Sequence, residues 1–524
     1  MKTVNVAYDD SIISKLKNAF TSIECVYTEA MQNARRAKAT RVDFYTTAGH
    51  LIISDNGGGI ADLQDFLTLA GSGWGEETIK REGAFGMGSF AMLYACESII
   101  VESNGQRFES DSQVLLNGHD VQICQSDVVH GTKITMTLEG LPETEVEFFN
   151  LISGLAKGFA IDVFVNDIQC EQPHRLNDDF VEIGVGKAFI PGISNADECP
   201  RYRNGSPILY FQGLRVDRQQ HQTTPHTVVH LDEQQFEVRM PDRDVLIDQD
   251  KQNKLIESQI MATWVEYLTA KKAELNSDEF VKLYPQMRKH GCLDLLNDVP
   301  LVPKEVLFVV NEAPHCERPN HNDSFSEETS VHRNDIGKVL SIEDYVDSET
   351  VWQWQYAYHT GALCYATFSL HDKHWLHRHI VELDDDKVIV SSVDKKTSTS
   401  FKGDWVCMSC EFGETVLMEG PLDTVDIKDD VIFKDGKMYI PAQFTDGEAI
   451  LKANTFSNYD DFDETAYQNE EQIFGAFLMR HNGSVLEAFK TALDNPYING
   501  LGIMDKKFEV VFHAKGFEVA EVAA

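Results

Sequence analysis

The first 140 residues alternate between helix-like and strand-like patterns of apolar side chains. Residues 12–38 carry apolar side chains at three- and four-residue spacing, which is the period of an amphipathic helix. Residues 42–47 and 51–54 have strand-like composition and are separated by a turn signal. Further short elements are predicted at 61–70, 89–96, 98–103, 121–124 and 132–138. This order predicts an α/β fold in which helices pack on one sheet.

Two further regions follow. A chain of 524 residues is too long for one hydrophobic core, since such cores stop growing at about 250–300 residues. Pro142 and the glutamates after it indicate a boundary. We therefore expect a first domain over 1–140, a second α/β domain over 141–275 and a strand-rich α+β region of unknown function over 276–524. In the second domain we expect helices at 146–158 and 254–275, and strands at 161–165, 208–211 and 228–231.

The composition is that of a globular protein without a membrane span. Hydrophobic residues make up 42% of the chain and charged residues 25%, and no apolar run reaches the ~18 residues that a membrane helix needs. The 10 cysteines follow no regular framework, which favours free thiols in a reducing compartment. Residues 1–20 lack the apolar centre of a signal peptide. We therefore expect a cytoplasmic protein.

The strongest compositional feature is the net charge of -38, from 84 acidic and 46 basic residues. Proteins that bind nucleic acid without sequence preference use Lys and Arg to displace counterions from phosphates. A surface this acidic repels a duplex unless basic residues are concentrated locally. Direct DNA binding is therefore disfavoured, and the charge is interpreted as a source of solubility.

Glu29 and Asn33 stand four residues apart in the first predicted helix, so they share one helical face. A carboxamide oxygen is a hard ligand that suits Mg²⁺, an ion that often bridges phosphates. A carboxylate can orient and deprotonate a water aimed at a phosphoryl group. By itself such a pair is common on solvated helices.

Two glycine-rich segments carry further candidate chemistry. The first runs from Asp55 to Ile60 at the end of a predicted strand, where glycines allow the backbone to approach a flat ligand and Asp55 can accept a hydrogen bond from an amine. The second runs from Gly83 to Phe90 before a predicted helix, where successive N–H groups suit an anion such as phosphate. It is not a Walker loop, because no Gly-Lys-Ser/Thr follows.

The order and spacing of these segments resemble the four ATP-binding motifs of the GHKL superfamily, with Gly131 and Thr132 at the start of a strand as the fourth. That superfamily contains DNA gyrase B, Hsp90-type chaperones, sensor histidine kinases and MutL-type mismatch-repair proteins. The resemblance implies a Bergerat-type ATPase α/β sandwich over 1–140, with ATP and Mg²⁺ as its cofactors.

The resemblance also implies roles for single residues. Glu29 matches the general base that activates the attacking water, and Asn33 matches the Mg²⁺ ligand. Asp55 would hold the adenine amine, and Thr132 would help through a water. Residues 71–86 would form a lid over the nucleotide. The other matched ATP-binding positions are Gly57, Gly59, Ile60, Gly86, Met87, Gly88, Ser89 and Phe90.

The gyrase, Hsp90 and MutL branch adds a second α/β domain, the transducer, which supplies a basic residue to the γ-phosphate. Residues 236–255 resemble the strand, loop and helix that deliver this residue in gyrase B, although the family's Gln-Thr-Lys is absent. Lys251 is the assigned candidate, and Arg243 and Lys254 remain alternatives. The stretch around Arg243 also resembles phage GHKL proteins of the rapid-lysis A type, whose site of action would be the host cytoplasm.

The last half of the chain has no comparable match. His371, His374, His377 and His379 are close enough in sequence to suggest a metal site, but in a strand His374 would point away from the others. Solvated or packing histidines are the preferred interpretation. Cys407 and Cys410 form a single CxxC pair without a second pair at zinc-site spacing, and are interpreted as structural.

Three functions compete. The first is an ATP-hydrolysing, ATP-gated conformational machine that dimerises and acts on an unidentified client. The second, a histidine kinase, is disfavoured because it needs a phospho-accepting His on a helix before the ATP domain, and the roughly 20 residues there contain no histidine. The third is a non-catalytic ATP-binding switch, or a phage anti-defence protein whose acidic surface binds a basic partner.

Overall fold

The computed structural model forms two compact units, Met1–Tyr267 and Leu268–Ala524. The residues that the structure describes are 23–47, 49–68, 88–138, 141–142, 144–195, 206–216, 227–239, 243–316, 325–327, 330–367, 369–394, 397–458, 461–493, 506–513 and 516–522. Within these residues, no helix combines the length and apolar character that crossing a membrane requires.

An eight-stranded sheet forms the first layer of the first unit, in the order β5-β4-β3-β6-β2-β1-β7-β8. Neighbouring strands are antiparallel except for β1 and β7, which are parallel. Its strands are β1 Arg41–Thr47, β2 His50–Asp55, β3 Ser98–Ser103, β4 Gln106–Asp111, β5 Cys124–Gln125, β6 Thr132–Thr137, β7 Asp162–Val165 and β8 Ile168–Gln169. Helices on a mixed sheet confirm the α/β fold class expected for this region.

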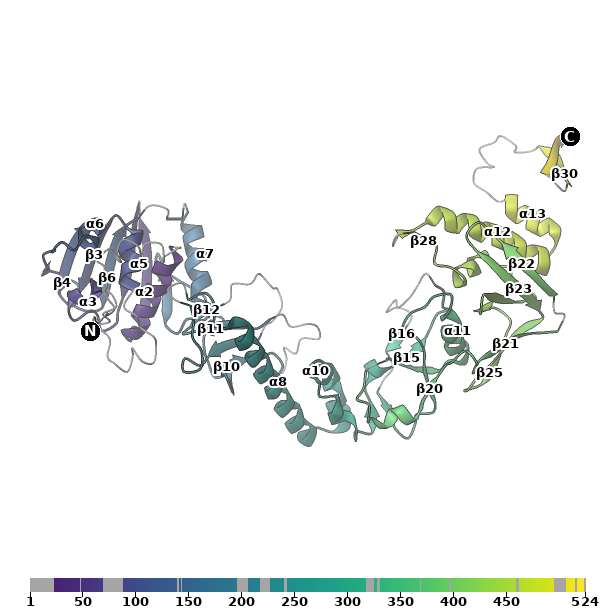
Figure 1. The fold of residues 1–524 in the computed structure, drawn as a ribbon, viewed down its shortest axis with the longest axis horizontal. Helices are drawn as coiled ribbons and strands as arrows, with labels where there is room; N and C mark the ends of the chain where they lie inside the picture. The colour runs from purple at the N-terminus through teal and green to yellow at the C-terminus, as the bar shows by residue number, and fades with distance from the viewer. Residues whose placement is uncertain are drawn as a thin grey trace, which may run out of the picture. The chain divides into compact units, whose positions relative to one another are not determined.

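Helices cover this sheet and bury its apolar face (Figure 1). They are α2 Glu24–Arg36, α3 Leu63–Phe66, α5 Gly88–Ala95, α6 Ser112–Leu116 and α7 Glu145–Ala156. Tyr27 of α2 packs edge-on against Phe44 of β1 and Phe148 of α7, with ring centroids 6.1 and 5.8 Å apart. Helix α7 begins with a capping box between Thr144 and Glu147.

The sheet and its core continue beyond the boundary that the sequence pattern predicts after residue 140. The strand at 161–165, which the pattern places in the second domain, is β7, and it pairs with β1 in the first sheet. Phe148 and Ile152 of α7 belong to the same hydrophobic core. The physical reason is that β1 leaves an open edge, and α7 is the crossover that brings a parallel strand to it.

A second sheet completes the first unit, in the order β12-β11-β13-β10-β9. Its elements are β9 Val181–Ile183, β10 Gly186–Phe189, β11 Ile208–Phe211, β12 Leu214–Val216 and β13 Val228–Leu231, followed by α8 Gln249–Glu274. The β11–β12 turn packs tightly on the end of α7, because a Cβ at Gly213 would lie 3.1 Å from Phe159. This turn therefore brings the second sheet to the first.

The second unit is rich in short strands, as expected for 276–524. Its helices are α9 Ser277–Phe280, α10 Tyr284–Lys289, α11 Val351–Thr360, α12 Glu464–Asn482 and α13 Val485–Leu493, with 3-10 helices η3 Val281–Leu283, η4 Leu293–Leu296, η5 Lys304–Val306, η7 Trp375–Arg378 and η8 Gly447–Lys452. Its first strands, in sheets β14-β17 and β16-β15-β19-β18-β20, are β14 Leu301–Val302, β15 Leu307–Val310, β16 Phe325–Glu327, β17 Val331–His332, β18 Val339–Ser341, β19 Leu363–Tyr365 and β20 Ile380–Glu382.

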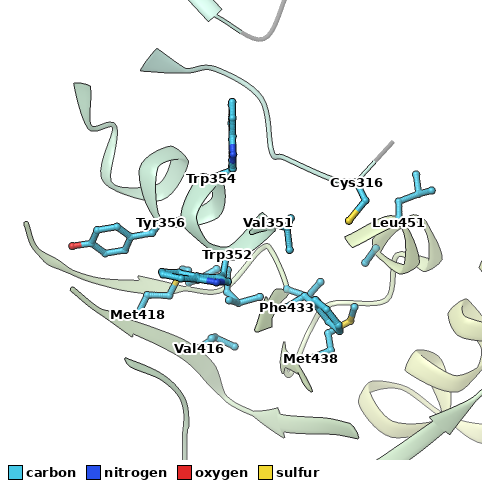
Figure 2. Packing of buried hydrophobic residues seen from close by; sticks show 14 of the residues in the cluster. Cys316, Val351, Trp352, Trp354, Tyr356, Val416, Met418, Phe433, Met438 and Leu451 are labelled. Carbon is cyan, nitrogen blue, oxygen red and sulfur yellow. The ribbon is translucent and has the colours of Figure 1, made fainter. Parts of the chain in front are cut away.

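The remaining strands form sheets β21-β24-β25 and β22-β23-β27-β26 and two hairpins: β21 Ile389–Val393, β22 Thr397–Lys402, β23 Cys407–Gly413, β24 Thr415–Glu419, β25 Thr424–Ile427, β26 Ile432–Lys434, β27 Lys437–Pro441, β28 Ser457–Asn458, β29 Asp461–Phe462, β30 Lys507–His513 and β31 Gly516–Val522. Figure 2 shows Trp352 and Tyr356 of α11 in one buried cluster with Val416 and Met418 of β24. Burial of this helix face joins the sheets into a single core.

Candidate functional site

Glu29 lies in the middle of α2, with 5% of its surface exposed. Its carboxylate is in contact with the first residue of α5, because a Cβ at Gly88 would collide with Glu29 Oε2. A side chain at this position would have to displace the carboxylate. The fold therefore brings together two of the predicted motifs that lie 59 positions apart in the sequence.

Asp55 is the last residue of β2 and lies directly opposite Thr132, the first residue of β6. The Gly57 amide donates a hydrogen bond to Asp55 Oδ1 at 2.8 Å. Gly131 has a φ of 72°, and a Cβ there would collide with the Asp55 carbonyl oxygen. Because these strand ends meet, the second and fourth motifs adjoin each other.

Ser103 and Asn104 hold the glycine segment after Asp55, and sequence reasoning missed both. The Ile60 amide donates to Ser103 Oγ at 2.8 Å, and Ser103 Oγ donates to the Gly131 carbonyl at 2.7 Å. Asn104 Nδ2 donates to the carbonyl oxygen of Gly58 at 3.1 Å. The Ser-Asn-Gly turn at the end of β3 was the sequence signal that could have identified them.

Burial raises the pKa of Asp55, because it disfavours the charged carboxylate, and the hydrogen bond from Gly57 offsets part of this shift. A half-buried carboxylate of this kind gains stability from a ligand that donates a hydrogen bond to it. An aromatic amine is such a donor. The electrostatics of Asp55 thus suit the adenine contact that the resemblance implies.

The second sheet's region contributes an arginine to Glu29. Arg243 is 5% exposed, and its Nε donates to Glu29 Oε1 at 3.0 Å while its Nη1 donates to Gln212 Oε1 at 3.1 Å. Gln32 of α2 donates through Nε2 to the Gln212 carbonyl at 2.9 Å. The four side chains therefore form a buried hydrogen-bonded network between α2 and the β11–β12 turn. The sequence named Arg243 only as one of three alternatives for a basic residue, and it gave no signal for Gln212 or for the contact with Glu29.

Two members of this network have unfavourable backbone conformations. Gln212 has a φ of 53° and Arg243 a φ of 54°, in the left-handed region that non-glycine residues seldom adopt. Each such residue costs about 1–3 kcal/mol, and such residues cluster at functional sites. Lys251 and Lys254, by contrast, lie exposed in the first turns of α8. The geometry thus favours Arg243 over the assigned Lys251 as the basic residue of the site.

Asn33 is half-buried one turn after Glu29 on α2. Its Oδ1 accepts a hydrogen bond from Arg36 Nη1 at 3.2 Å, and the same Nη1 lies 4.0 Å from Glu29 Oε2. An amide oxygen beside a carboxylate fits Mg²⁺ in ligand type. The guanidinium of Arg36 competes with a cation for this oxygen, so Mg²⁺ would have to displace it.

Part of the predicted phosphate segment lies outside the described residues. This applies to Gly86, Met87 and the expected lid at 71–86. Gly88, Ser89 and Phe90 form the first turn of α5, and Phe90 is buried in the core. Of these three residues, Gly88 is the one that lies against the Glu29 carboxylate.

The histidines of the second unit have separate local contacts. The strand considered for 371–379 is instead the 3-10 helix η7, and His374 caps it by accepting from the Leu376 amide at 3.1 Å. His377 Nε2 bonds to the His371 carbonyl at 3.1 Å, and His379 Nδ1 to the Gly337 carbonyl at 3.2 Å. In the described part of the chain, His, Cys, Asp and Glu side chains form no group of three or more that could hold a metal ion.

The comparison with known protein families gives a match to part of the first unit. No curated protein matches the chain. Residues 21–137 match the family described as histidine kinase-, DNA gyrase B- and HSP90-like ATPase, a segment that contains all four motifs. This segment of the chain is therefore an ATP-binding domain of the GHKL superfamily.

Proposed function

We propose that the chain hydrolyses ATP with Mg²⁺ at this site, and that nucleotide binding and hydrolysis drive a conformational cycle. The observation that carries the proposal is the position of Glu29. Its carboxylate is buried in contact with the glycine at the start of α5, where the phosphates would lie, and it is oriented by Arg243. A buried, oriented carboxylate beside a phosphate is equipped to activate a water.

The adenine end is supported by the second cluster of contacts. Asp55 would accept the adenine amine, with Gly57, Gly59 and Ile60 lining the base and Thr132 contributing through a water. Gly86, Met87, Gly88, Ser89 and Phe90 would bind the phosphates through backbone N–H groups. Asn33 would hold Mg²⁺, which when bound neutralises charge on the β- and γ-phosphates.

Arg243 gives this site a means of sensing the nucleotide. Its guanidinium donates to Glu29 through Nε and to Gln212 through Nη1, and a γ-phosphate in the pocket would compete for these donors. Transfer of Arg243 to the phosphate would release Glu29 to act on water. The β11–β12 turn and the segment before α8 would then report the state of the nucleotide to the rest of the chain.

We further propose that ATP promotes homodimerisation in the cytoplasm and that the dimer acts on an unidentified client. DNA as a direct ligand is not part of the proposal, because the net charge of -38 opposes it. Sedimentation velocity with and without a non-hydrolysable ATP analogue tests dimerisation. An unchanged mass would refute it.

One observation favours the alternative, a non-catalytic ATP-binding switch or phage anti-defence interaction protein. Glu29 already has a cationic partner in Arg243 and a second cation, Arg36, at 4.0 Å. A carboxylate oxygen that already accepts a hydrogen bond from a guanidinium is less available to orient a water. If the pair persists when ATP is bound, the site binds without turnover, and the acidic surface would serve a basic partner.

Steady-state ATP hydrolysis and nucleotide affinity, measured on the same variants, distinguish the ATP-hydrolysing machine from the non-catalytic switch. Glu29→Gln keeps the shape of the side chain and removes the base, so turnover should fall by about 10²–10⁴-fold while ATP still binds. Glu145→Gln is the matched control, since Glu145 is exposed on α7. Equal turnover in Glu29→Gln and wild type would overturn the proposed base, whereas absence of turnover in wild type with ATP bound would favour the switch.

A further inference from the structure

A cavity in the second unit lies where three parallel strands end. Strand β18 pairs in parallel with β19 on one side and with β20 on the other. The last residues of these strands, Ser341, Tyr365 and Glu382, all line the cavity. The carboxyl edge of parallel strands is the edge at which α/β sheets commonly bind ligands.

The chain path makes this edge a topological switch point. From β18 the chain passes through α11 and returns as β19, and it then crosses to the opposite side of β18 to form β20. When the connections that leave two adjacent strands, here β18 and β19, run in opposite directions, the segments that follow the two strands diverge and a crevice opens between them. The cavity coincides with that crevice.

The cavity has the size and lining of a small-molecule site. Its volume is about 570 Å³, within the range of roughly 300–1,000 Å³ that ligand pockets occupy. Leu370, Ile380 and Val381 provide apolar surface, and Ser341, Thr367 and Tyr365 provide hydroxyl groups. The charged or titratable lining residues are Asp372, His377, Glu382 and Lys387.

The charged residues at this edge of the sheet indicate which class of ligand fits the cavity. Exposed carboxylates follow every one of the three strands, at Glu343, Asp344, Asp372, Glu382, Asp384, Asp385 and Asp386. Lys387, the lysine of the lining, forms an ion pair with Asp384 and donates to the Glu382 carbonyl at 3.0 Å. A phosphate or carboxylate would therefore meet net negative charge, whereas a cation would meet Asp372 and Glu382.

A metal ion is the weaker candidate, because the described residues provide no cluster of three metal ligands. An organic cation needs no such cluster, since each N–H of an amine or guanidine can pair with a separate acceptor. Its hydrocarbon part would contact Leu370 and Val381.

We propose that this cavity binds a small organic cation, an amine or guanidine of about the size of an amino acid. Asp372 and Glu382 pair with its charged group, and the hydroxyls of Ser341 and Thr367 accept further hydrogen bonds. This site belongs to the second unit alone and does not depend on the ATPase proposal. It gives residues 276–524 a ligand-sensing role of their own.

Calorimetric titration of the full chain with agmatine, putrescine and spermidine tests the proposal, with inorganic phosphate and inositol as anionic and neutral probes. Titration near 0.15 M salt screens general attraction to the acidic surface. The test variant is Asp372→Asn with Glu382→Gln. The matched control is Asp429→Asn with Glu419→Gln, which removes the same charge from exposed positions outside the cavity.

We expect saturable binding of at least one cation at one site per chain, and at least a tenfold loss of affinity in the test variant. The control variant should bind as wild type does. Equal loss in both variants would show general charge attraction and overturn the site. Preference for phosphate or inositol, or no saturable binding of any of the three cations, would also overturn it. Melting temperatures of both variants show whether the fold is retained.

Discussion

Arg243→Ala is the sharpest test of the network around Glu29. In the wild type, Arg243 Nε lies 3.0 Å from Glu29 Oε1, and the side chains are 5% and 7% exposed, respectively. The variant therefore leaves the Glu29 carboxylate buried without its nearest cation. Removing one partner of a buried pair costs about 3–5 kcal/mol. Arg36 at 4.0 Å still compensates part of the charge, so the lower end, about 3 kcal/mol, is expected.

Thermal unfolding of the full chain measures this loss. For a unit of this size about 3 kcal/mol corresponds to a decrease of roughly 6–12 °C in Tm. Arg239→Ala is the control, because Arg239 pairs with Asp244 at the surface, with side chains 60% and 26% exposed, and such pairs are worth about 0–1 kcal/mol. Adding Glu29→Gln to Arg243→Ala should recover stability by removing the unpaired charge. If Arg243→Ala melts no lower than Arg239→Ala, the buried network does not stabilise the fold and the reasoning fails.

Three further predictions follow from the same structure. Gln212→Gly should change Tm little, because glycine accepts a φ of 53° without strain while the buried Arg243 Nη1 loses its acceptor. ATP turnover should change because Arg243 is no longer held in place, and unchanged turnover would refute a positioning role for Gln212. Asp55→Asn should abolish ATP binding, and calorimetry that gives the same ATP affinity for this variant would contradict the prediction. In the wild type, ATP should bind at pH values above the raised pKa of Asp55, and the affinity should be lost as the pH falls through that pKa, at a higher pH than for an ordinary aspartate. Burial lowers the pKa of His374 to about 4, so the unfolded chain binds the proton first, and His374 should contribute a loss on the order of 3 kcal/mol as pH falls from 6.5 to about 4. Burial lowers the pKa of His290 in the same unit to about 4 as well, so His374→Phe should remove part of the acid transition, and a variant with an unchanged transition would argue against the role of His374.

The sequence indicated that Glu29, Asp55 and the glycine-rich segments come together, because each lies in or at the end of a locally recognisable element. Asp55 and Thr132 meet because antiparallel strands β2 and β6 pair at those ends, and Gly88 meets Glu29 because α5 packs on α2. These contacts depend on turn and helix-start signals that are visible in the residues themselves.

The contribution of Arg243 and Gln212 could not be predicted in the same way. Arg243 is 214 positions from Glu29, and Gln212 is 180 positions from Gln32, so the contacts depend on how the second sheet docks. Local pattern also gives a strand at 161–165 without indicating which sheet it joins. Its parallel pairing with β1 depends on how α7 packs on the sheet, which is a tertiary contact and not a local sequence pattern.

The pairing of β1 with β7 limits which fragment of this ATP-binding region can be produced alone. A fragment that stops at residue 137, where the family match ends, would discard α7, β7 and β8. It would strip Phe148 from Tyr27 and leave the backbone of Arg41–Phe44 as a bare sheet edge, which is a template for aggregation. The shortest soluble fragment of this region should therefore extend past Gln169.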